Sequence, residues 1–311
     1  MAFFVGIDGG GTKTRCLVGD EASLLGTGTS SGCKLLRVGE ACTQDTLAAA
    51  IHEACVAAGV SPQAIVRTCG GITGAAHPEV ARTLARLLGH ILSGQIEVVG
   101  DMEIAFEAAF GSGPGVMVIA GTGSIAYGRN SAGETARAGG WGSVVSDEGS
   151  GYWIGVAAIG AALATHARGE DSRLLEGLMA QLDASSVDEL IARSNASPPP
   201  DFASLFPTVL AAAAEGDSRA AEVLYRAGGE LAKMAEEVTR RLFHDTDHVR
   251  VAAHGGVFAS SRQVTESFHR QLGSLRPAVE FLGTAIDPAV GALNRARRSF
   301  AEAARRSSRG R

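Results

Sequence analysis

Two glycine-rich segments of the chain combine hydroxyl groups with apolar flanks, a pattern that could hold phosphate. The first reads Val5-Gly6-Ile7-Asp8-Gly9-Gly10-Gly11-Thr12-Lys13-Thr14, and the second Val118-Ile119-Ala120-Gly121-Thr122-Gly123-Ser124. Glycine permits positive φ and close backbone approach, so its N–H groups can line a concave surface that favours phosphate oxygens. Either segment alone also fits an ordinary glycine-rich hairpin. Their recurrence favours one nucleotide held between two such turns.

The first segment adds a carboxylate at the end of its apolar run. Asp8 could hold a hydrated magnesium ion, bound through water, against phosphates that the turn contacts. This combination argues for a nucleoside triphosphate bound with Mg²⁺. The spacing is neither that of a Walker-type loop nor that of a dinucleotide fold. The candidate nucleotide-binding residues of the two segments are Asp8, Gly10, Gly11, Thr12, Lys13, Thr14, Gly121, Thr122, Gly123 and Ser124.

A further carboxylate, Asp101, directly follows the apolar segment Ile96-Glu97-Val98-Val99-Gly100. The carboxyl end of a strand is where ligands of open α/β sheets collect. A hydroxyl group is a poor nucleophile, and its phosphorylation needs a carboxylate that orients it and accepts its proton. Asp101 is therefore a candidate catalytic base. Its alternative role is to cap the helix that follows.

Periodicity predicts elements that would position these residues at strand ends. Three strands are followed by alternating helices and strands, and after a glycine-rich linker the three-strand opening recurs. A last helix should begin near Asp287-Pro288, because Asp is a good N-cap and Pro a good first-turn residue. The expected strands cover residues 3–7, 14–18, 24–28, 64–69, 97–99, 116–120, 124–129, 135–138 and 249–253. The expected helices cover 39–58, 77–88, 102–110, 147–168, 174–193, 202–243 and 260–272.

Composition narrows the protein class. The chain has 311 residues and 45% hydrophobic content, enough for two domains with sizeable cores. A net charge of −5 argues against a nucleic-acid partner. No apolar run approaches the roughly 20 residues that cross a membrane, so a cytoplasmic protein with no membrane partner is expected. Five cysteines, odd in number and irregularly spaced, indicate reduced thiols, and no structural metal is expected.

These motifs resemble the acetate and sugar kinase, Hsc70 and actin superfamily. Within it, the chain is most similar to the N-acetylglucosamine kinase and BadF-BadG-BcrA-BcrD ATPase family. The resemblance runs from residues 6–14 to 287–293, and its most specific part is the block Ala138-Gly139-Gly140-Trp141-Gly142-Ser143-Val144-Val145-Ser146-Asp147-Glu148-Gly149-Ser150-Gly151-Tyr152-Trp153-Ile154-Gly155.

The resemblance implies an α/β fold: two actin-like, ribonuclease H-like domains with duplicated βββαβαβα cores and an interdomain cleft. Residues 1–112 with the C-terminal helix 290–311 would form one domain, and residues 113–289, including a helical insert, the other. It also implies that Asp101 is the catalytic base and that Gly255 and Gly256 contact adenosine. Gly140, Trp141, Gly142 and Asp147 would line an amino-sugar pocket. From the residues alone, Asp147 or Ser150 could instead cap a helix, and Trp141 could fill a core.

One segment departs from the family pattern. Members that bind N-acetylglucosamine usually carry a sugar-contacting asparagine after the third strand, where this chain reads Ser30-Ser31-Gly32-Cys33-Lys34-Leu35. Lysine prefers a carboxylate or phosphate and repels an amine. Lys34 is thus either a substrate contact or an ordinary surface residue.

The resulting hypothesis is an ATP-dependent kinase that phosphorylates the 6-hydroxyl of N-acetylglucosamine or a close amino sugar. Glucosamine, N-acetylmuramic acid and glucose are alternative substrates. A different class is an ATPase activator of a reductase or dehydratase, but its iron–sulfur cluster needs cysteines that this chain lacks after Cys69. A module that binds without turnover is a third class. Relatives are often homodimers, and the expected partner is a small-molecule sugar.

Overall fold

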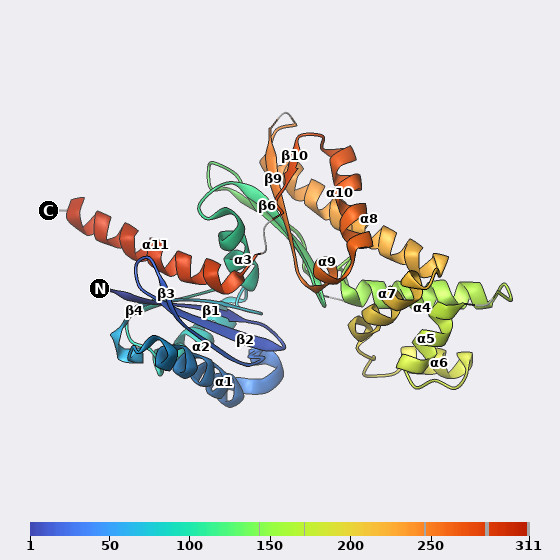
Figure 1. The fold of residues 1–311 in the computed structure, drawn as a ribbon, viewed down its shortest axis with the longest axis horizontal. Coiled ribbons are helices and arrows are strands. Elements are labelled where there is room, and N and C mark those ends of the chain that lie inside the picture. Colours follow the sequence, from blue (N-terminus) through green and yellow to red (C-terminus); the bar gives the residue numbers. More distant parts are fainter. Residues whose placement is uncertain (143, 171, 246, 284–285, 310–311) are drawn as a thin grey trace. The chain divides into compact units, whose positions relative to one another are not determined.

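The computed structural model describes residues 1–142, 144–170, 172–245, 247–283 and 286–309. The chain forms two compact units (Figure 1). The first comprises Met1–Gly113 and Thr284–Arg311, and the second comprises Pro114–Gly283.

The first unit contains a five-stranded sheet in the order β3-β2-β1-β4-β5. Strand β1 pairs antiparallel with β2 and parallel with β4, while β2–β3 is antiparallel and β4–β5 parallel. The order of elements is βββαβαβα, as expected. The strands are β1 (Phe3–Gly9), β2 (Lys13–Gly19), β3 (Leu24–Ser31), β4 (Ile65–Ile72) and β5 (Gln95–Val99). The helices are α1 (Leu35–Ala58), α2 (Pro78–Gly89), α3 (Asp101–Phe110) and the returning α11 (Pro288–Arg309), with a short 3₁₀ turn η1 (Pro62–Ala64).

Each face of this sheet carries its own core. Val5 and Ile7 pack in the cluster that includes α1 and α2, whereas Phe4 and Leu17 pack against α3 and α11 (Figure 1). Successive side chains of a strand point to opposite faces. Asp8 therefore shares the face of Phe4, and Lys13 and Arg15 share the face of Leu17. Strand alternation places all three on the α3–α11 side.

The backbone of helix α11 packs directly against the backbones of β1 and α3. A Cβ atom on Gly6 of β1 would lie 2.3 Å from the backbone nitrogen of Leu293. A Cβ on Gly291 would lie 2.0 Å from the carbonyl oxygen of Ile104 in α3. Only glycine fits at these two positions, so α11 is seated closely on both β1 and α3.

The second unit repeats the three-strand opening in a sheet of order β10-β9-β6-β7-β8. Val116, Val118 and Ala126 of this sheet lie in one core with Leu231 and Val238 of α8. The expected duplicated actin-like α/β fold is confirmed. The strands are β6 (Gly115–Ala120), β7 (Ser124–Arg129), β8 (Thr135–Gly139), β9 (Val249–His254) and β10 (Val279–Phe281). The helices are α4 (Gly151–His166), α5 (Arg173–Gln181), α6 (Val187–Ser194), α7 (Phe206–Ala214), α8 (Ser218–Leu242), α9 (Gly256–Ser260) and α10 (Arg262–Leu275), with a 3₁₀ turn η2 (Phe202–Leu205).

Several element boundaries differ from the sequence expectations. Strand β4 continues to Ile72 rather than ending at Cys69, because Gly71 fits against the side chain of Ile104 in a strand conformation. The short strand β10 was not expected, since three residues carry too little periodicity to recognise. In the described part of the chain, no helix is both long and apolar enough to cross a membrane.

Candidate active site

The first glycine turn is open where it was expected to contact phosphate. The Gly10 N–H donates to the carbonyl of Lys13 at 2.9 Å, which closes the turn. A Cβ on Gly11 would meet no atom within 4 Å, and Thr12 and Lys13 are exposed. Thr14 is buried, and its hydroxyl donates to the carbonyl of Ser31 at 2.7 Å. The exposed rim of the turn, Gly11 to Lys13, thus offers backbone N–H groups, the Thr12 hydroxyl and the Lys13 ammonium. The buried Thr14 supports the turn from below.

Three carboxylates gather beside this turn on the α3–α11 side of the sheet. Burial, together with the nearby charges of Asp101 and Asp287, raises the pKa of Asp8 to about 6, while Arg15 opposes the shift. Arg15 Nη1 lies 2.5 Å from Asp287 Oδ2. A cavity of about 340 Å³ opens here, lined by Asp8, Lys13, Arg15, Ile286, Asp287 and Pro288.

Asp8 fits a magnesium ion held through water rather than by a cage of protein ligands. Carboxylate oxygen is the hard ligand that Mg²⁺ prefers, and the ion characteristically keeps several waters. Among the described residues, no group of three or more His, Cys, Asp or Glu side chains is arranged to hold a metal. Burial is the main cause of the raised pKa of Asp8, and a nearby divalent cation would favour its ionised form.

Asp101 is the first residue of α3, and the N-cap is Gly100. The capping alternative for Asp101 is therefore wrong. The Gly100 N–H donates to Glu103 Oε1 at 3.3 Å, so Glu103 performs the capping interaction. Asp101 Oδ2 accepts a hydrogen bond from the hydroxyl of Thr73 at 2.8 Å, and Oδ1 accepts from the Met102 N–H at 3.0 Å. The carboxylate is oriented at the end of β5, near enough to Asp8 for their charges to interact.

Sequence reasoning missed Thr73, Arg15 and Asp287 as site residues. Thr73 directly follows β4, but Gly70-Gly71 suggested that this strand had already ended. Arg15 lies opposite Asp8 in the β1–β2 register, so strand alternation was a signal that could have found it. The sequence predicted Asp287 only as the residue that begins the last helix. No pattern in its own segment indicated that it would lie near Asp8.

The segment that departs from the family pattern lies beneath the first turn. Cys33 is buried, its N–H donates to the carbonyl of Gly10 at 3.1 Å, and a Cβ on Gly9 would lie 2.6 Å from its Sγ. Lys34 is exposed at the N-cap of α1 and makes no side-chain cap. Cys33 is thus a supporting residue, whereas Lys34 and Ser31 are exposed.

The second glycine turn is also closed by a backbone hydrogen bond, but over one residue fewer than the first. The Gly121 N–H donates to the carbonyl of Gly123 at 2.9 Å, and Thr122 is exposed. Ser124 is buried, and its hydroxyl donates to the carbonyl of Glu148 at 2.8 Å. As in the first turn, the buried hydroxyl supports the loop and the exposed one is available.

Asp147 lies beneath the second turn in a strained conformation. Its φ is 69°, it is only 6% exposed, and a Cβ on Gly123 would lie 2.6 Å from its Oδ2. Burial raises its pKa, against the opposing effect of hydrogen bonds from the backbone of Gly142, Ser124 and Gly140. Oδ1 has no hydrogen-bond partner among the described residues. Because the N-cap of α4 is Ser150, whose Oγ accepts from the Trp153 N–H at 3.2 Å, Asp147 does not cap that helix.

The remaining expected ligand residues of this unit form two further groups. Gly255 has a φ of 106° at the N-cap of α9, where a Cβ would lie 2.3 Å from the carbonyl oxygen of Ala120. This brings the Gly255-Gly256 turn to the end of β6 from which the second glycine turn begins. Trp141 is 62% exposed and stacks under the Arg137 guanidinium at 3.9 Å, so the core-filling alternative is wrong. Gly140 and Gly142 flank it with positive φ, and Ser143 lies outside the described residues.

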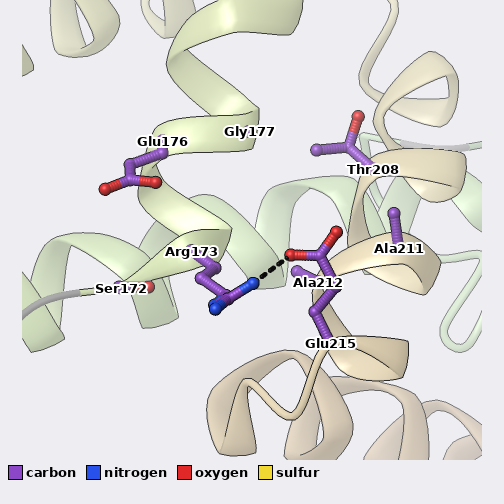
Figure 2. Close-up of a pocket in the computed structure, with 8 residues that line it drawn as sticks. All are labelled: Ser172, Arg173, Glu176, Gly177, Thr208, Ala211, Ala212 and Glu215. Carbon is purple, nitrogen blue, oxygen red and sulfur yellow. Dashed lines mark hydrogen bonds and ion pairs between the residues drawn. The ribbon is translucent and has the colours of Figure 1, made fainter.

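A cavity of about 850 Å³ lies elsewhere, between α5 and α7 (Figure 2). Arg173 and Glu215 pair across it at 2.7 Å, and both side chains are more than half exposed. Such screened surface pairs contribute little energy. Since these charges already neutralise each other, we assign no phosphoryl chemistry to this groove.

Comparison with known proteins agrees with this geometry. The model of the BadF/BadG/BcrA/BcrD ATPase family matches residues 5–296. The chain is 33% identical to the N-acetylmuramic acid/N-acetylglucosamine kinase of Clostridium acetobutylicum, over 94% of this chain and 97% of the relative. It is 29% identical to the N-acetyl-D-glucosamine kinase of Dictyostelium discoideum, over 93% and 96% of the two chains.

Solved structures show the same fold. A putative N-acetylglucosamine kinase from Chromobacterium violaceum superimposes with a TM-score of 0.75 at 24% identity, over 94% of this chain and 98% of that one. The glucokinase of Streptomyces griseus gives 0.56 at 18% identity, over 95% and 98%. The expected enzyme class, a phosphotransferase with an alcohol acceptor, is confirmed by the curated relatives. With nearly its whole length matched, the chain belongs to the BadF/BadG/BcrA/BcrD ATPase family.

Proposed function

We propose that this protein is an ATP-dependent kinase of N-acetylated amino sugars, which transfers the γ-phosphate to the 6-hydroxyl of N-acetylglucosamine or N-acetylmuramic acid. The names of the two curated relatives support this substrate class. The observation that carries the chemistry is the Asp101 carboxylate, oriented by the Thr73 hydroxyl at 2.8 Å on the same side of the sheet as Asp8.

Asp101 acts as the base. A carboxylate within hydrogen-bond reach of the sugar hydroxyl orients it and accepts its proton as the phosphoryl group is transferred. The Thr73 hydroxyl occupies one lone pair of Oδ2 and limits rotation of the carboxylate. A second lone pair stays available to the sugar, since a carboxylate oxygen accepts more than one hydrogen bond.

The first turn acts on the phosphates. Gly11 would supply a backbone N–H group, Thr12 a hydroxyl and Lys13 a positive charge along the exposed part of the turn, while Gly10 closes the turn through its own N–H. Asp8 would hold magnesium through water, and the bound ion would neutralise charge on the phosphate oxygens. Gly121 to Ser124 would contribute the second set of phosphate contacts, with Gly255 and Gly256 contacting adenosine.

Asp147 and Trp141 are the proposed sugar-binding side chains. The buried Asp147 Oδ1 lacks a partner among the described residues, and a sugar hydroxyl would supply the missing donor. Trp141 exposes most of its ring, which suits stacking on a sugar face. Gly140 and Gly142 shape the loop that presents the ring.

Lys34 refines the choice of sugar. Its exposed ammonium would pair with the lactyl carboxylate of N-acetylmuramic acid and would repel the free amine of glucosamine. We therefore expect N-acetylmuramic acid and N-acetylglucosamine to be the preferred substrates, and glucosamine and glucose to be poorer ones. Dependence on ATP would place the enzyme in the cytoplasm.

The test is ADP release from Mg²⁺ and ATP with N-acetylglucosamine, N-acetylmuramic acid, glucosamine, glucose or water alone, at matched concentrations. We expect rates well above the water rate with the two acetylated sugars, and a phosphorus-coupled NMR signal at C6 of the product. A rate that no sugar changes would contradict the proposal and favour the ATPase-activator class. Absence of ADP despite ATP binding would favour a module without turnover.

A further inference from the structure

We propose that Arg295 is a positioning residue for Asp101. Its guanidinium restrains the turn between β5 and α3, and so holds the Asp101 carboxylate in place without touching the substrate. It rests on the proposed role of Asp101 as base. The evidence lies entirely within the first unit, in contacts between α11, β5 and α3.

Arg295 extends from α11 to both sides of the turn that carries Asp101. Its Nε and Nη2 atoms donate to Glu97 Oε1, on β5, at 3.0 and 2.7 Å. Its Nη1 lies 3.3 Å from Glu103 Oε2, in the first turn of α3. The Arg295 side chain is only 21% exposed, so water screens these interactions weakly. One rigid, planar cation therefore ties the strand before Asp101 to the helix after it.

Glu103 passes this restraint to the residue next to Asp101. While Oε2 faces Arg295, Oε1 accepts the N–H of Gly100, the N-cap of α3. The carboxylate of Glu103 is thus held from both sides. A shift of Glu103 would break its hydrogen bond with the Gly100 N–H. The backbone at Gly100 could then move, and the Asp101 side chain would change direction with it.

A second ion pair between the same two helices provides a matched contrast. Arg298 of α11 pairs with Glu107 of α3, and its Nη2 donates to Glu107 Oε2 at 2.8 Å. The carboxylate of this pair, Glu107, is more buried than Glu97 and Glu103, whereas the Arg298 side chain is 31% exposed against 21% for Arg295. It lies about 9 Å further along α3 from Asp101, at 1.5 Å per residue. A purely structural clamp would make the two pairs equivalent, whereas positioning requires the nearer one.

The test compares Arg295→Met and Arg298→Met in the full-length protein by steady-state kinetics, thermal unfolding and amide hydrogen exchange. We expect Arg295→Met to lower kcat roughly tenfold, within the ~100-fold that a 1 Å misplacement can produce. KM for sugar and ATP should stay within about twofold, because the binding groups are untouched. Exchange of the peptide spanning residues 97–103 should accelerate. Arg298→Met should lower the melting temperature at least as much, with kcat and exchange at 97–103 near wild type.

Two further variants keep the test decisive. Arg298→Met leaves a buried carboxylate unpaired and could fail to fold; Arg298→Met/Glu107→Leu then serves as the control. Glu103→Gln keeps an acceptor for the Gly100 N–H but removes the charge facing Arg295. Combined with Arg295→Met, it should lower kcat no further than Arg295→Met alone, because both act through one chain of contacts. Additive losses of kcat in the double variant would show that Arg295 and Glu103 do not act through the same contacts.

The outcomes separate this inference from the proposed function. Equal kcat losses in Arg295→Met and the Arg298 control, or unchanged exchange at residues 97–103 in Arg295→Met, would overturn the positioning role. If the wild-type protein phosphorylated no sugar, the proposed function would fail, while the exchange comparison would still decide whether Arg295 braces the turn.

Discussion

The two glycine turns each have a closing backbone hydrogen bond and a buried hydroxyl, but they differ in where their carboxylates come from. Gly10 donates its N–H to the carbonyl of Lys13 and Gly121 to that of Gly123, and the buried hydroxyls of Thr14 and Ser124 support the two loops. Beside the first turn, Asp8 belongs to the strand itself, and Asp101 comes from the neighbouring β5–α3 connection. Beneath the second, the carboxylate belongs to Asp147, which follows β8.

This difference shows how two copies of the same strand–turn–strand unit can be surrounded by different chemical groups. The first turn lies among charged groups, namely Asp8, Lys13, Arg15, Asp101 and Asp287, which suits phosphoryl transfer. The carboxylate at the second turn is buried and bonded by backbone N–H groups, with one oxygen left over. We infer that the first turn carries the chemistry and the second carries recognition.

The most severe test of this contrast is Asp101→Asn. Removing the base should lower kcat by about 10² to 10⁴-fold with little change in the ATP dissociation constant. Steady-state kinetics and ATP titration calorimetry measure these two quantities. Thr73→Val, which removes the orienting hydrogen bond and keeps the carboxylate, should give a smaller loss. Near-wild-type turnover of Asp101→Asn would eliminate it as the base.

Asp8→Asn should separate function from stability. We expect sugar-dependent turnover to fall by at least tenfold and magnesium to lose its stabilising effect in thermal unfolding. Since the pKa of Asp8 is about 6 when folded and 3.8 in its ordinary state, the native protein binds this proton more tightly than the unfolded chain does. Wild-type stability should therefore fall relative to Asp8→Asn as pH rises from about 4 to 6, by on the order of 2 kcal/mol in metal-free buffer.

Denaturant unfolding of both proteins across this pH range measures the difference. It should level off above pH 6, where Asp8 is ionised in both states, and magnesium should reduce it there. A wild type that gains stability relative to Asp8→Asn between pH 4 and 6 would show that the carboxylate is not destabilised in the apo protein.

At the second turn, Asp147→Asn should affect recognition more than chemistry. Asparagine tolerates the positive φ of this position, so the variant should fold. Loss of charge-assisted hydrogen bonding should raise KM for the sugar by roughly tenfold, equivalent to about 1.4 kcal/mol. ATP affinity should stay within about twofold. A kcat loss as large as that of Asp101→Asn would remove the proposed division between the two turns.

The smallest expected effect is that of Lys34→Met. For N-acetylmuramic acid, KM should rise about three- to fivefold, because an exposed charge pair contributes at most about 1 kcal/mol. KM for N-acetylglucosamine, which has no carboxylate, should not change. The selective increase should diminish at high ionic strength. Equal changes for both sugars would make Lys34 a surface residue without a role in specificity.

Much of the architecture was readable from the chain. The two three-strand openings carry clear apolar runs, and their glycine turns stand at the predicted places. Asp8 became a candidate because it lies near the end of a recognisable strand, and Asp101 because it closely follows one. Thr73 was missed because two glycines usually end a strand, yet here Gly71 is required for Ile104 to pack against β4.

The sequence by itself determined the duplicated order of elements, the two glycine turns and the strand-end carboxylates, because these depend on local periodicity and on the conformations that glycine allows. Only the tertiary structure decided which charged groups meet. Arg15 joins Asp287, Arg295 joins Glu97 and Glu103, and Asp147 turns beneath Gly123. These contacts join segments distant in the chain, and they depend on how closely helices and loops pack onto the sheets, which no local pattern encodes.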